Sequence, residues 1–177
     1  GELTLRRAMV MWNEAGSDDN FYDSAGVGES VLTAWAGMGR RNECPKGMRL
    51  TAWNGGMSVV RPDERIDPRN QRAPKNKDHY ANLKAQAWFS LRARFENAYK
   101  KKMGREYDAT HIIGLPADLP YLEQLQDELC QPHKKESGTG KVLVDKQPDG
   151  AASPNLADAV VMAFFPLSAK ASILDVL

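Results

Sequence analysis

The chain has 177 residues, of which 42% are hydrophobic and 27% are charged. This length is sufficient for one well-packed domain and too short for two, so we expect residues 1–177 to form a single globular domain. The sequence has no run of about 18 apolar residues and no signal peptide, which excludes a transmembrane helix and predicts a soluble protein that is not secreted.

The formal net charge of +1 does not identify a partner, because a value near zero can hide separate charged patches. One basic cluster consists of Lys100, Lys101, Lys102 and Arg105. A second consists of Arg40, Arg41, Lys46 and Arg49. Each cluster suits a polyanionic partner, and each is equally compatible with an ordinary solvated face.

The two cysteines, Cys44 and Cys130, have neither a C-x-x-C spacing nor histidines at ligand spacing. This pattern excludes the usual zinc sites and fits a reduced, intracellular compartment. We expect Cys130 in the core and Glu128 at the surface. The three histidines are not clustered, so we expect them to be structural or exposed.

The first third of the chain predicts, in order, a helix, a strand, a helix and a strand, over residues 2–15, 20–22, 30–38 and 48–53. The first helix ends at Gly16, and the second ends in Gly37 and Gly39. Between them, Gly26 and Gly28 permit a positive φ or a close approach of the backbone.

A long loop is predicted over residues 54–77, which contain three prolines, at positions 62, 68 and 74. Loops of this length are uncommon unless they are functional or mobile. This loop is basic, with Arg61, Arg65, Arg69, Arg72, Lys75 and Lys77. It can follow a phosphate backbone or become ordered on a partner.

The remainder predicts a helix over residues 78–103, a helix over 119–130, a buried strand over 141–144 and a last helix from residue 154. The first of these has a regular apolar stripe. Pro132 ends the second. Ser153 can cap the last helix, which has Pro154 at its first position, and Pro166 ends it.

Two glycine-containing stretches imitate nucleotide-binding motifs but lack their essential residues. GVGES is followed by Val31 where a dinucleotide fingerprint requires its third glycine. GTGK has Lys135 where a phosphate-binding loop requires its first glycine, and Val142 where it requires serine or threonine. Neither stretch therefore predicts a nucleotide site.

Two aspartates are candidates for a metal site. Asp23 follows a strand, and open α/β sheets place their chemistry at the carboxyl ends of strands. Asp158 has apolar neighbours in the sequence and needs a partner such as a divalent cation. With Lys146 after the buried strand, the set suits two-metal phosphodiester cleavage. The alternatives are that Asp23 forms a local turn and that Asp158 is a first-turn helix acid.

Four segments, in this order, resemble the C-terminal nuclease domain of a tailed-phage terminase large subunit: FYDSAGVGESV, NLKAQAWFSLRARF, GKVLVDKQPDG and SPNLADAVVMAF. The resemblance covers almost the whole chain, and SPNLADAVVMAF after a lysine-bearing strand is its most specific part. It implies an RNase H-like α/β fold, with a mixed sheet flanked by helices. In that family the domain cuts concatemeric viral DNA into genome units, using acidic residues and Mg²⁺ or Mn²⁺.

The resemblance also implies roles for individual residues. Asp23 matches the family's second acid and Asp158 its last, so both are expected to be catalytic ligands of a two-metal site. Lys146 matches a lysine expected near the phosphate or positioning the last acid. DNA contacts are expected from Lys146 and from Arg61, Arg65, Arg69, Arg72, Lys75, Lys100 and Lys101.

The partners implied by the resemblance are double-stranded DNA, the terminase ATPase domain, the small terminase subunit and the portal protein, in the cytoplasm of a host bacterium and without a membrane. The family's first acid lies on a strand upstream of the first helix, and this sequence begins at that helix. We therefore expect an N-terminally truncated nuclease domain, without its ATPase motor, that cleaves DNA weakly or not at all in isolation.

Two other functions remain open. The chain is alternatively a non-catalytic DNA-binding or assembly module, in which the basic residues grip DNA and the two aspartates are structural. It is alternatively another RNase H-like nuclease, such as a Holliday-junction resolvase, although that class gives no reason for SPNLADAVVMAF.

Overall fold

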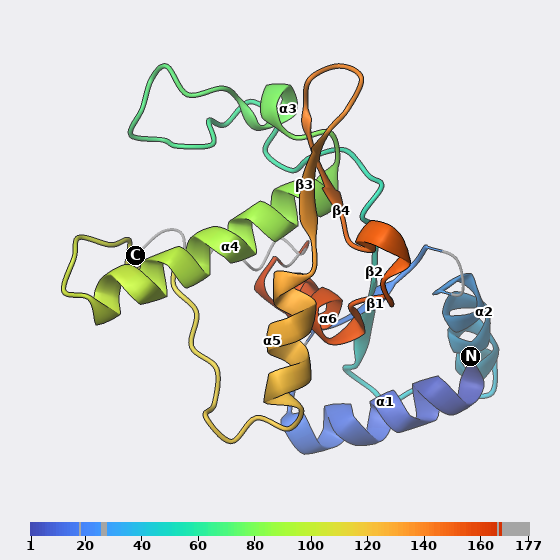
Figure 1. The fold of residues 1–177 in the computed structure, drawn as a ribbon. Coiled ribbons are helices and arrows are strands. Elements are labelled where there is room, and N and C mark those ends of the chain that lie inside the picture. The colour runs from blue at the N-terminus through green and yellow to red at the C-terminus, as the bar shows by residue number, and fades with distance from the viewer. Residues whose placement is uncertain (18, 26–27, 166, 168–177) are drawn as a thin grey trace. The chain divides into compact units, whose positions relative to one another are not determined.

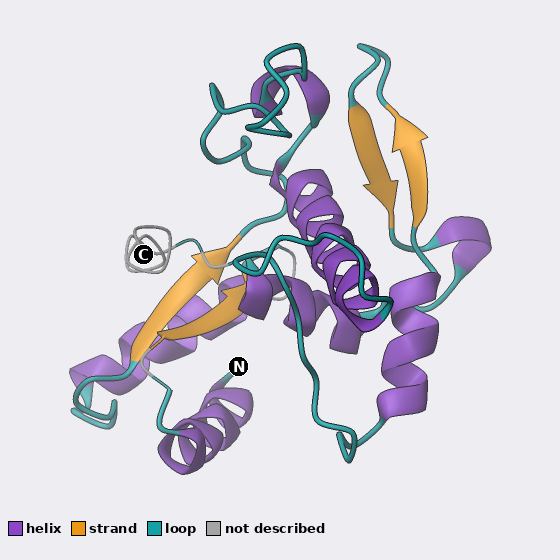
Figure 2. Ribbon diagram, turned by 90° about the vertical axis from the view of Figure 1, so that its left-hand side faces the viewer, coloured by secondary structure: helices purple, strands orange, loops and turns teal. Residues whose placement is uncertain are grey.

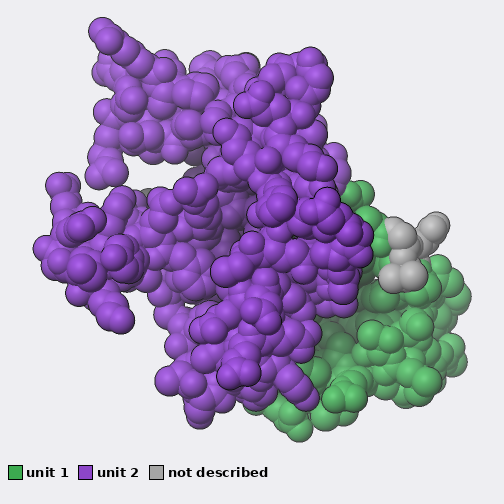
Figure 3. All heavy atoms as spheres, viewed as in Figure 1, with its two compact units in different colours: residues 1–55 green, residues 56–177 purple. Residues whose placement is uncertain are grey.

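The computed structural model describes residues 1–17, 19–25, 28–165 and 167. The chain divides into two compact units, unit 1 over Gly1–Gly55 and unit 2 over Gly56–Leu177 (Figure 3). The expected single domain stays a prediction. Within the described residues, none of the helices is long and apolar enough to cross a membrane.

Unit 1 contains two helices, α1 (Glu2–Ala15) and α2 (Gly28–Arg40). The predicted end of α1 is confirmed, because Gly16 takes the left-handed conformation with φ 62° and its N–H bonds the Trp12 carbonyl. The predicted end of α2 is wrong, since the helix continues through both expected stop glycines. Interior glycine costs a helix only about 1 kcal/mol, and the intervening Met38 is fully buried.

The strands of unit 1 are β1 (Asp19–Asp23) and β2 (Arg49–Trp53), which pair in parallel. Their register places Asp23 opposite Trp53, and the Ser24 N–H continues the ladder to the Trp53 carbonyl at 3.0 Å. The predicted strands are therefore confirmed, with Asp23 at the carboxyl end of β1.

Unit 2 contains four α-helices and one hairpin among its described residues (Figure 1). The elements are α3 (Asn76–His79), α4 (Leu83–Lys102), α5 (Leu122–Cys130), β3 (His133–Glu136), β4 (Val142–Asp145), the 3₁₀ turn η1 (Pro148–Gly150) and α6 (Asn155–Phe164). Helix α4 packs against β4 and α6, and α5 packs against α6. Figure 2 shows the hairpin beside the N-terminal end of α4.

Helix α4 begins later than the apolar stripe predicts. Tyr80 has an extended backbone, with φ −100° and ψ 140°, and the Asn82 side chain caps α4 by accepting from the Ala85 N–H at 2.9 Å. The buried side chains Leu83, Ala87 and Leu91 then form the core face of the helix. The predicted helix over 78–103 is thus α3, a break and α4.

The sequence analysis does not predict strand β3. Its sequence, HKKE, is entirely polar and exposed, so it carries no apolar alternation. It is defined by antiparallel pairing with β4, in which Lys134 lies opposite Val144. The buried strand predicted over 141–144 is confirmed as β4, with Val142 and Val144 facing the core.

The described residues form two separate two-stranded sheets, one parallel and one antiparallel. The predicted α/β class is confirmed, but the single mixed sheet is not found in the described part of the chain. Among the described residues, the polar strand β3 pairs with β4 alone, and β1 and β2 pair with each other alone.

Candidate active site around Asp158 and Lys146

The ion pair between Lys146 and Asp158 is the centre of the candidate site. Lys146 directly follows β4, and Asp158 lies in the first turn of α6, where its N–H bonds the Pro154 carbonyl at 2.8 Å. The Lys146 Nζ donates to Asp158 Oδ2. The two side chains are 20% and 19% exposed, so the pair is largely shielded from water.

Partial burial increases the energetic weight of this pair. Attraction between unit charges is stronger near a protein interior than in water, whereas exposed pairs contribute little. Removing one partner leaves the other charge shielded from water and uncompensated. The Asp158 carboxylate is therefore held in an environment that requires a cation beside it.

The start of α6 is capped from another helix. Ser153 was expected to cap it, but α6 has no side-chain cap from its own first residues. Instead Glu128 Oε2, on α5, accepts from the N–H groups of Leu156 at 2.6 Å and Ala157 at 3.0 Å. The predicted helix end at Pro166 lies outside the described residues.

The expected locations of Glu128 and Cys130 are both wrong. Glu128 is 9% exposed, whereas Cys130 is exposed. Burial raises the pKa of Glu128, but the hydrogen bonds from Ala157, Gln124 and Leu156 outweigh it, so the pKa lies below its ordinary value. Glu128 is buried because its charge meets the positive end of the α6 dipole.

Asp23 lies in unit 1, at the end of β1, with an exposed side chain. Its Oδ1 accepts from the Ala25 N–H at 3.0 Å, so the local turn considered for this residue forms. A Cβ on Gly28 would overlap the Asp23 carbonyl, which explains glycine at position 28. Gly26 lies outside the described residues. A shared metal site of Asp23 and Asp158 stays a prediction.

Asp145, the last residue of β4, is already engaged by Lys135 across the hairpin, with an N–O distance of 2.5 Å. It also accepts from the Gln147 N–H at 3.0 Å. These contacts, led by the Lys135 bond, lower the pKa of Asp145. Asp145 is therefore committed to the hairpin, next in sequence to Lys146 but with a different partner.

The expected loop over 54–77 is confirmed up to α3. Hydrogen bonds to α4 and hydrogen bonds within residues 61–77 hold it in place. Gln86 exchanges two hydrogen bonds with the Val60 backbone, at 2.8 and 3.0 Å. The buried Asn76 donates to the Arg61 carbonyl at 2.9 Å. Asp63 accepts from Lys75 at 3.0 Å and from Lys77 at 2.8 Å.

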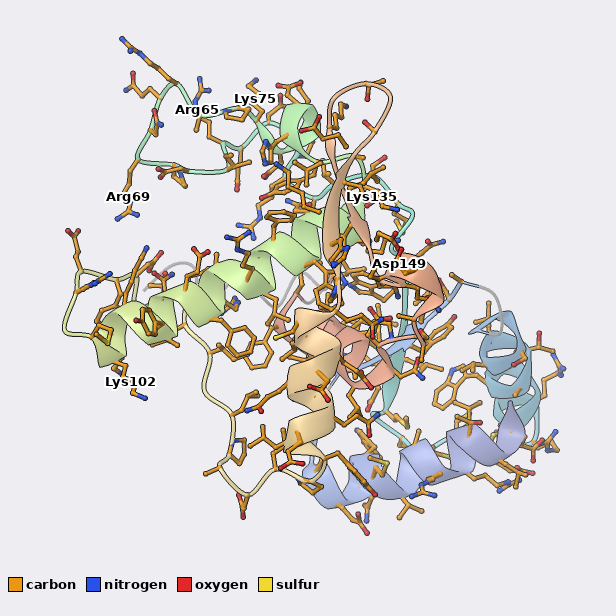
Figure 4. The ribbon with its side chains drawn as sticks, in the orientation of Figure 1. Arg65, Arg69, Lys75, Lys102, Lys135 and Asp149 are labelled. Atoms are coloured by element: carbon orange, nitrogen blue, oxygen red, sulfur yellow. The ribbon has the colours of Figure 1, made fainter. Side chains whose placement is uncertain are left out.

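Apart from Lys146, the predicted DNA-binding residues occupy two regions, the loop and the end of α4 (Figure 4). In the loop, Arg69 has an 80% exposed side chain, and Arg65 donates to the Ala73 carbonyl at 2.6 Å. Arg61, at 60% exposed, lies near Glu64, and Arg72 is exposed. The other region, formed by Lys100, Lys101 and Lys102, is the exposed last turn of α4.

A cavity of about 400 Å³ lies between α4, α5 and the β3–β4 hairpin. Its walls include Trp88, Leu91, Leu129 and Val144. Neither Lys146 nor Asp158 lines it. This apolar cavity is therefore distinct from the candidate active site.

The donor chemistry of the site suits a hard divalent cation. Asp158 provides carboxylate oxygens, the ligand type that Mg²⁺ and Mn²⁺ prefer, in a place that already holds a positive ammonium. Within the residues that the structure describes, however, no group of three or more His, Cys, Asp or Glu side chains is assembled. The fit thus rests on Asp158 with a second acid from elsewhere, for which Asp23 is the candidate.

Comparison with solved structures shows which known proteins have a similar fold. The chain is similar to the nuclease domain of the large terminase subunit gp2 of bacterial virus Sf6, with TM-score 0.71 and 27% identity over 90% of this chain and 70% of that one. A lysine-to-alanine variant of that domain with manganese and beta-thujaplicinol gives TM-score 0.73 and 25% identity, over the same shares. A variant with calcium gives TM-score 0.70 and 28% identity, over 88% and 68%.

The sequence matches no protein-family model and no curated protein. The structural neighbours nevertheless confirm the resemblance to a terminase nuclease domain that the four sequence segments suggested.

Proposed function

We propose that this chain is the nuclease domain of a viral DNA-packaging terminase, which cuts concatemeric double-stranded DNA into genome units by metal-dependent phosphodiester hydrolysis. The observation that carries the proposal is the shielded Lys146–Asp158 pair at the start of α6. It belongs to a chain that matches nuclease domains of a phage terminase over nine tenths of its length.

In this proposal Asp23 and Asp158 hold Mg²⁺ or Mn²⁺ in a two-metal site. The similar Sf6 nuclease domain was solved with manganese and with calcium. When bound, such cations polarise the scissile phosphate and lower the pKa of an attacking water. The described residues that contribute are carboxylates at a strand end and at a helix start, both on regular elements that restrict their positions.

Lys146 has two roles in the proposed reaction. It neutralises Asp158 when no metal is bound, which lowers the cost of keeping a carboxylate out of water. With DNA bound, its ammonium faces the charge of the scissile phosphate. In this scheme Lys146 acts through its charge, and its ammonium keeps its protons.

DNA binding is assigned to cations of the loop and of the end of α4. Arg61, Arg65, Arg69, Arg72 and Lys75 come from the loop, and Lys100 and Lys101 come from the end of α4. Contacts of this kind recognise the phosphate backbone rather than base sequence. The proposed partners are double-stranded DNA, the ATPase domain, the small terminase subunit and the portal, in the host bacterial cytoplasm.

A second candidate is a DNA-binding module without catalysis. The observation in its favour is that the described residues assemble no group of three potential metal ligands. The two candidates differ in their response to metal. Binding of lysine and arginine to the phosphate backbone of DNA depends on salt but not on a chelator, whereas the proposed cleavage requires the metal.

A nicking assay distinguishes these candidates. Supercoiled plasmid is incubated with excess protein and Mn²⁺, with and without EDTA, for the unmodified chain and for Asp158→Asn. The proposal predicts slow, Mn²⁺-dependent nicking that Asp158→Asn abolishes. Salt-sensitive DNA binding that EDTA leaves unchanged, without nicking and without Mn²⁺ binding by the chain, would instead favour the binding module.

A further inference from the structure

We infer that Glu128, on α5, and Gln131, the residue that follows the last residue of α5, are positioning residues that set Asp158 and Lys146 at the distance their chemistry requires. This inference rests on the proposed function, since it concerns the same site. It assigns roles to two residues whose side chains bond backbone groups at and beside the two residues of the pair.

Glu128 fixes the position of Asp158 through the backbone. The first N–H groups of any helix lack intrahelical partners, and in α6 two of them, from Leu156 and Ala157, donate to Glu128 Oε2 at 2.6 and 3.0 Å. Asp158 is the next residue. The orientation of its side chain therefore follows from how Glu128 holds this turn.

The Glu128 side chain is itself restricted. Gln124 Nε2 donates to Glu128 Oε1 at 2.8 Å, so both carboxylate oxygens are engaged. The side chain is nearly buried. A carboxylate that is bonded on both oxygens and surrounded by protein has little rotational freedom, which makes it a suitable fixed point for α6.

Gln131 fixes the segment that carries Lys146. Its Nε2 donates to the Lys146 carbonyl at 2.5 Å and to the Ala152 carbonyl at 2.8 Å. One amide group thus bridges the end of the β4 strand and the chain just before α6. It limits how far these two backbone segments can move apart.

The two residues act from the C-terminal end of α5 and the residue that follows it. Glu128 and Gln131 are three positions apart, a spacing that brings side chains to one helix face. One helix therefore holds both halves of the candidate site, and α5 also packs on α6. Outer residues that orient ligands affect metal affinity by about 10- to 100-fold in other sites.

The test is Mn²⁺ affinity, measured by calorimetry on the full chain and on Glu128→Leu, Glu128→Gln and Gln131→Leu. The matched control is Leu125→Ala, which removes a buried apolar side chain from the same helix and keeps both hydrogen-bonding residues, Glu128 and Gln131. We expect Glu128→Leu to weaken binding by about tenfold or more. We expect Gln131→Leu to weaken Mn²⁺ binding less. Of the two carbonyls that lose their donor in this variant, only that of Lys146 belongs to a residue of the ion pair.

Glu128→Gln keeps an acceptor oxygen for the α6 N–H groups and should restore much of the affinity. Leu125→Ala should leave the affinity within about twofold of the unmodified chain while lowering stability. The inference is wrong if Glu128→Leu binds Mn²⁺ as the unmodified chain does, or if Leu125→Ala weakens binding to the same degree.

A second readout separates this inference from the proposed function. The ammonium signal of Lys146, in a chain with ¹⁵N-labelled lysine, reports whether the pair with Asp158 persists. If the unmodified chain binds no Mn²⁺, the metal site is contradicted, and the ammonium signal alone decides. Its loss in Glu128→Leu but not in Leu125→Ala supports positioning, and its persistence in both contradicts it.

Discussion

The ammonium of Lys146, directly after β4, donates to the carboxylate of Asp158, one turn into α6, across a separation of 12 residues in the sequence. Both side chains are mostly shielded from water. The contact joins the strand and the helix that follow one another along the chain, so it contributes to the stability of unit 2 as well as to the site.

Replacing Lys146 by methionine should destabilise the chain. The Asp158 carboxylate would remain largely out of water without this ammonium, and the loss of a hydrogen-bond partner by a shielded polar group costs about 1–3 kcal/mol. Urea unfolding measures the difference. The matched control is Lys135→Met, which breaks the more exposed pair with Asp145, whose lysine side chain is 61% and aspartate side chain 24% exposed, and should have a smaller effect. Equal effects of the two substitutions would contradict the shielding of the Lys146 pair.

Gly28→Ala should disturb the end of β1. A Cβ at this position overlaps the Asp23 carbonyl, so the backbone has to move. We expect a loss of about 1–3 kcal/mol in the free energy of unfolding, which is typical of overpacking, and altered amide shifts at Asp23. Gly39→Ala is the control, because a Cβ there meets nothing within 4 Å. It should be neutral or slightly stabilising.

Glu128 should contribute to the loss of stability in acid. Its pKa in the folded state lies below the ordinary value of 4.5, so the unfolded chain binds its proton first as the pH falls. The stabilisation is present above about pH 4.5 and is lost as the pH falls through the folded pKa. The free energy of unfolding should be measured between about pH 6 and about pH 3, a range that includes this value. Its decrease in acid should be shallower for Glu128→Gln than for the unmodified chain. An unchanged slope would contradict ionisation of Glu128 in the folded state.

Asp63→Asn should strengthen DNA binding if the loop contacts phosphate. Asp63 engages the ammonium groups of Lys75 and Lys77, and its loss makes both available. Fluorescence anisotropy with duplex DNA should show higher affinity, whereas Lys75→Gln should reduce the salt slope by about 1. The charge-matched control is Glu96→Gln, because Glu96 pairs with Arg92 on α4, outside the loop. A gain of the same size from the control would show a general charge effect.

The sequence was informative where local patterns determine the structure. Asp23 was predicted at a strand end from the aromatic residues before it, and the structure has it as the last residue of β1. The strand before Lys146 was predicted from its apolar run, and α6 was predicted around Asp158. These elements can be predicted because the residue pattern that indicates each of them lies within the element itself.

The sequence was uninformative where the structure depends on distant contacts. Glu128 caps a helix that begins 27 positions later, and β3 exists only through its pairing with β4. One signal for Glu128 was available, since Gln124, Glu128 and Gln131 recur at spacings of four and three on an amphipathic helix. A polar face of this kind beside a buried Leu125 indicates hydrogen bonding to another segment, although not to which one.

The central claim is that Asp23 and Asp158 are ligands of one metal site, and Mn²⁺ calorimetry on the unmodified chain, Asp23→Asn and Asp158→Asn tests it most directly. Asp149→Asn is the matched control, because Asp149 is exposed and has φ 55°, a conformation that asparagine tolerates. The account predicts binding by the unmodified chain and the control, and its loss in both of the other variants. Undiminished binding by Asp158→Asn would contradict the account.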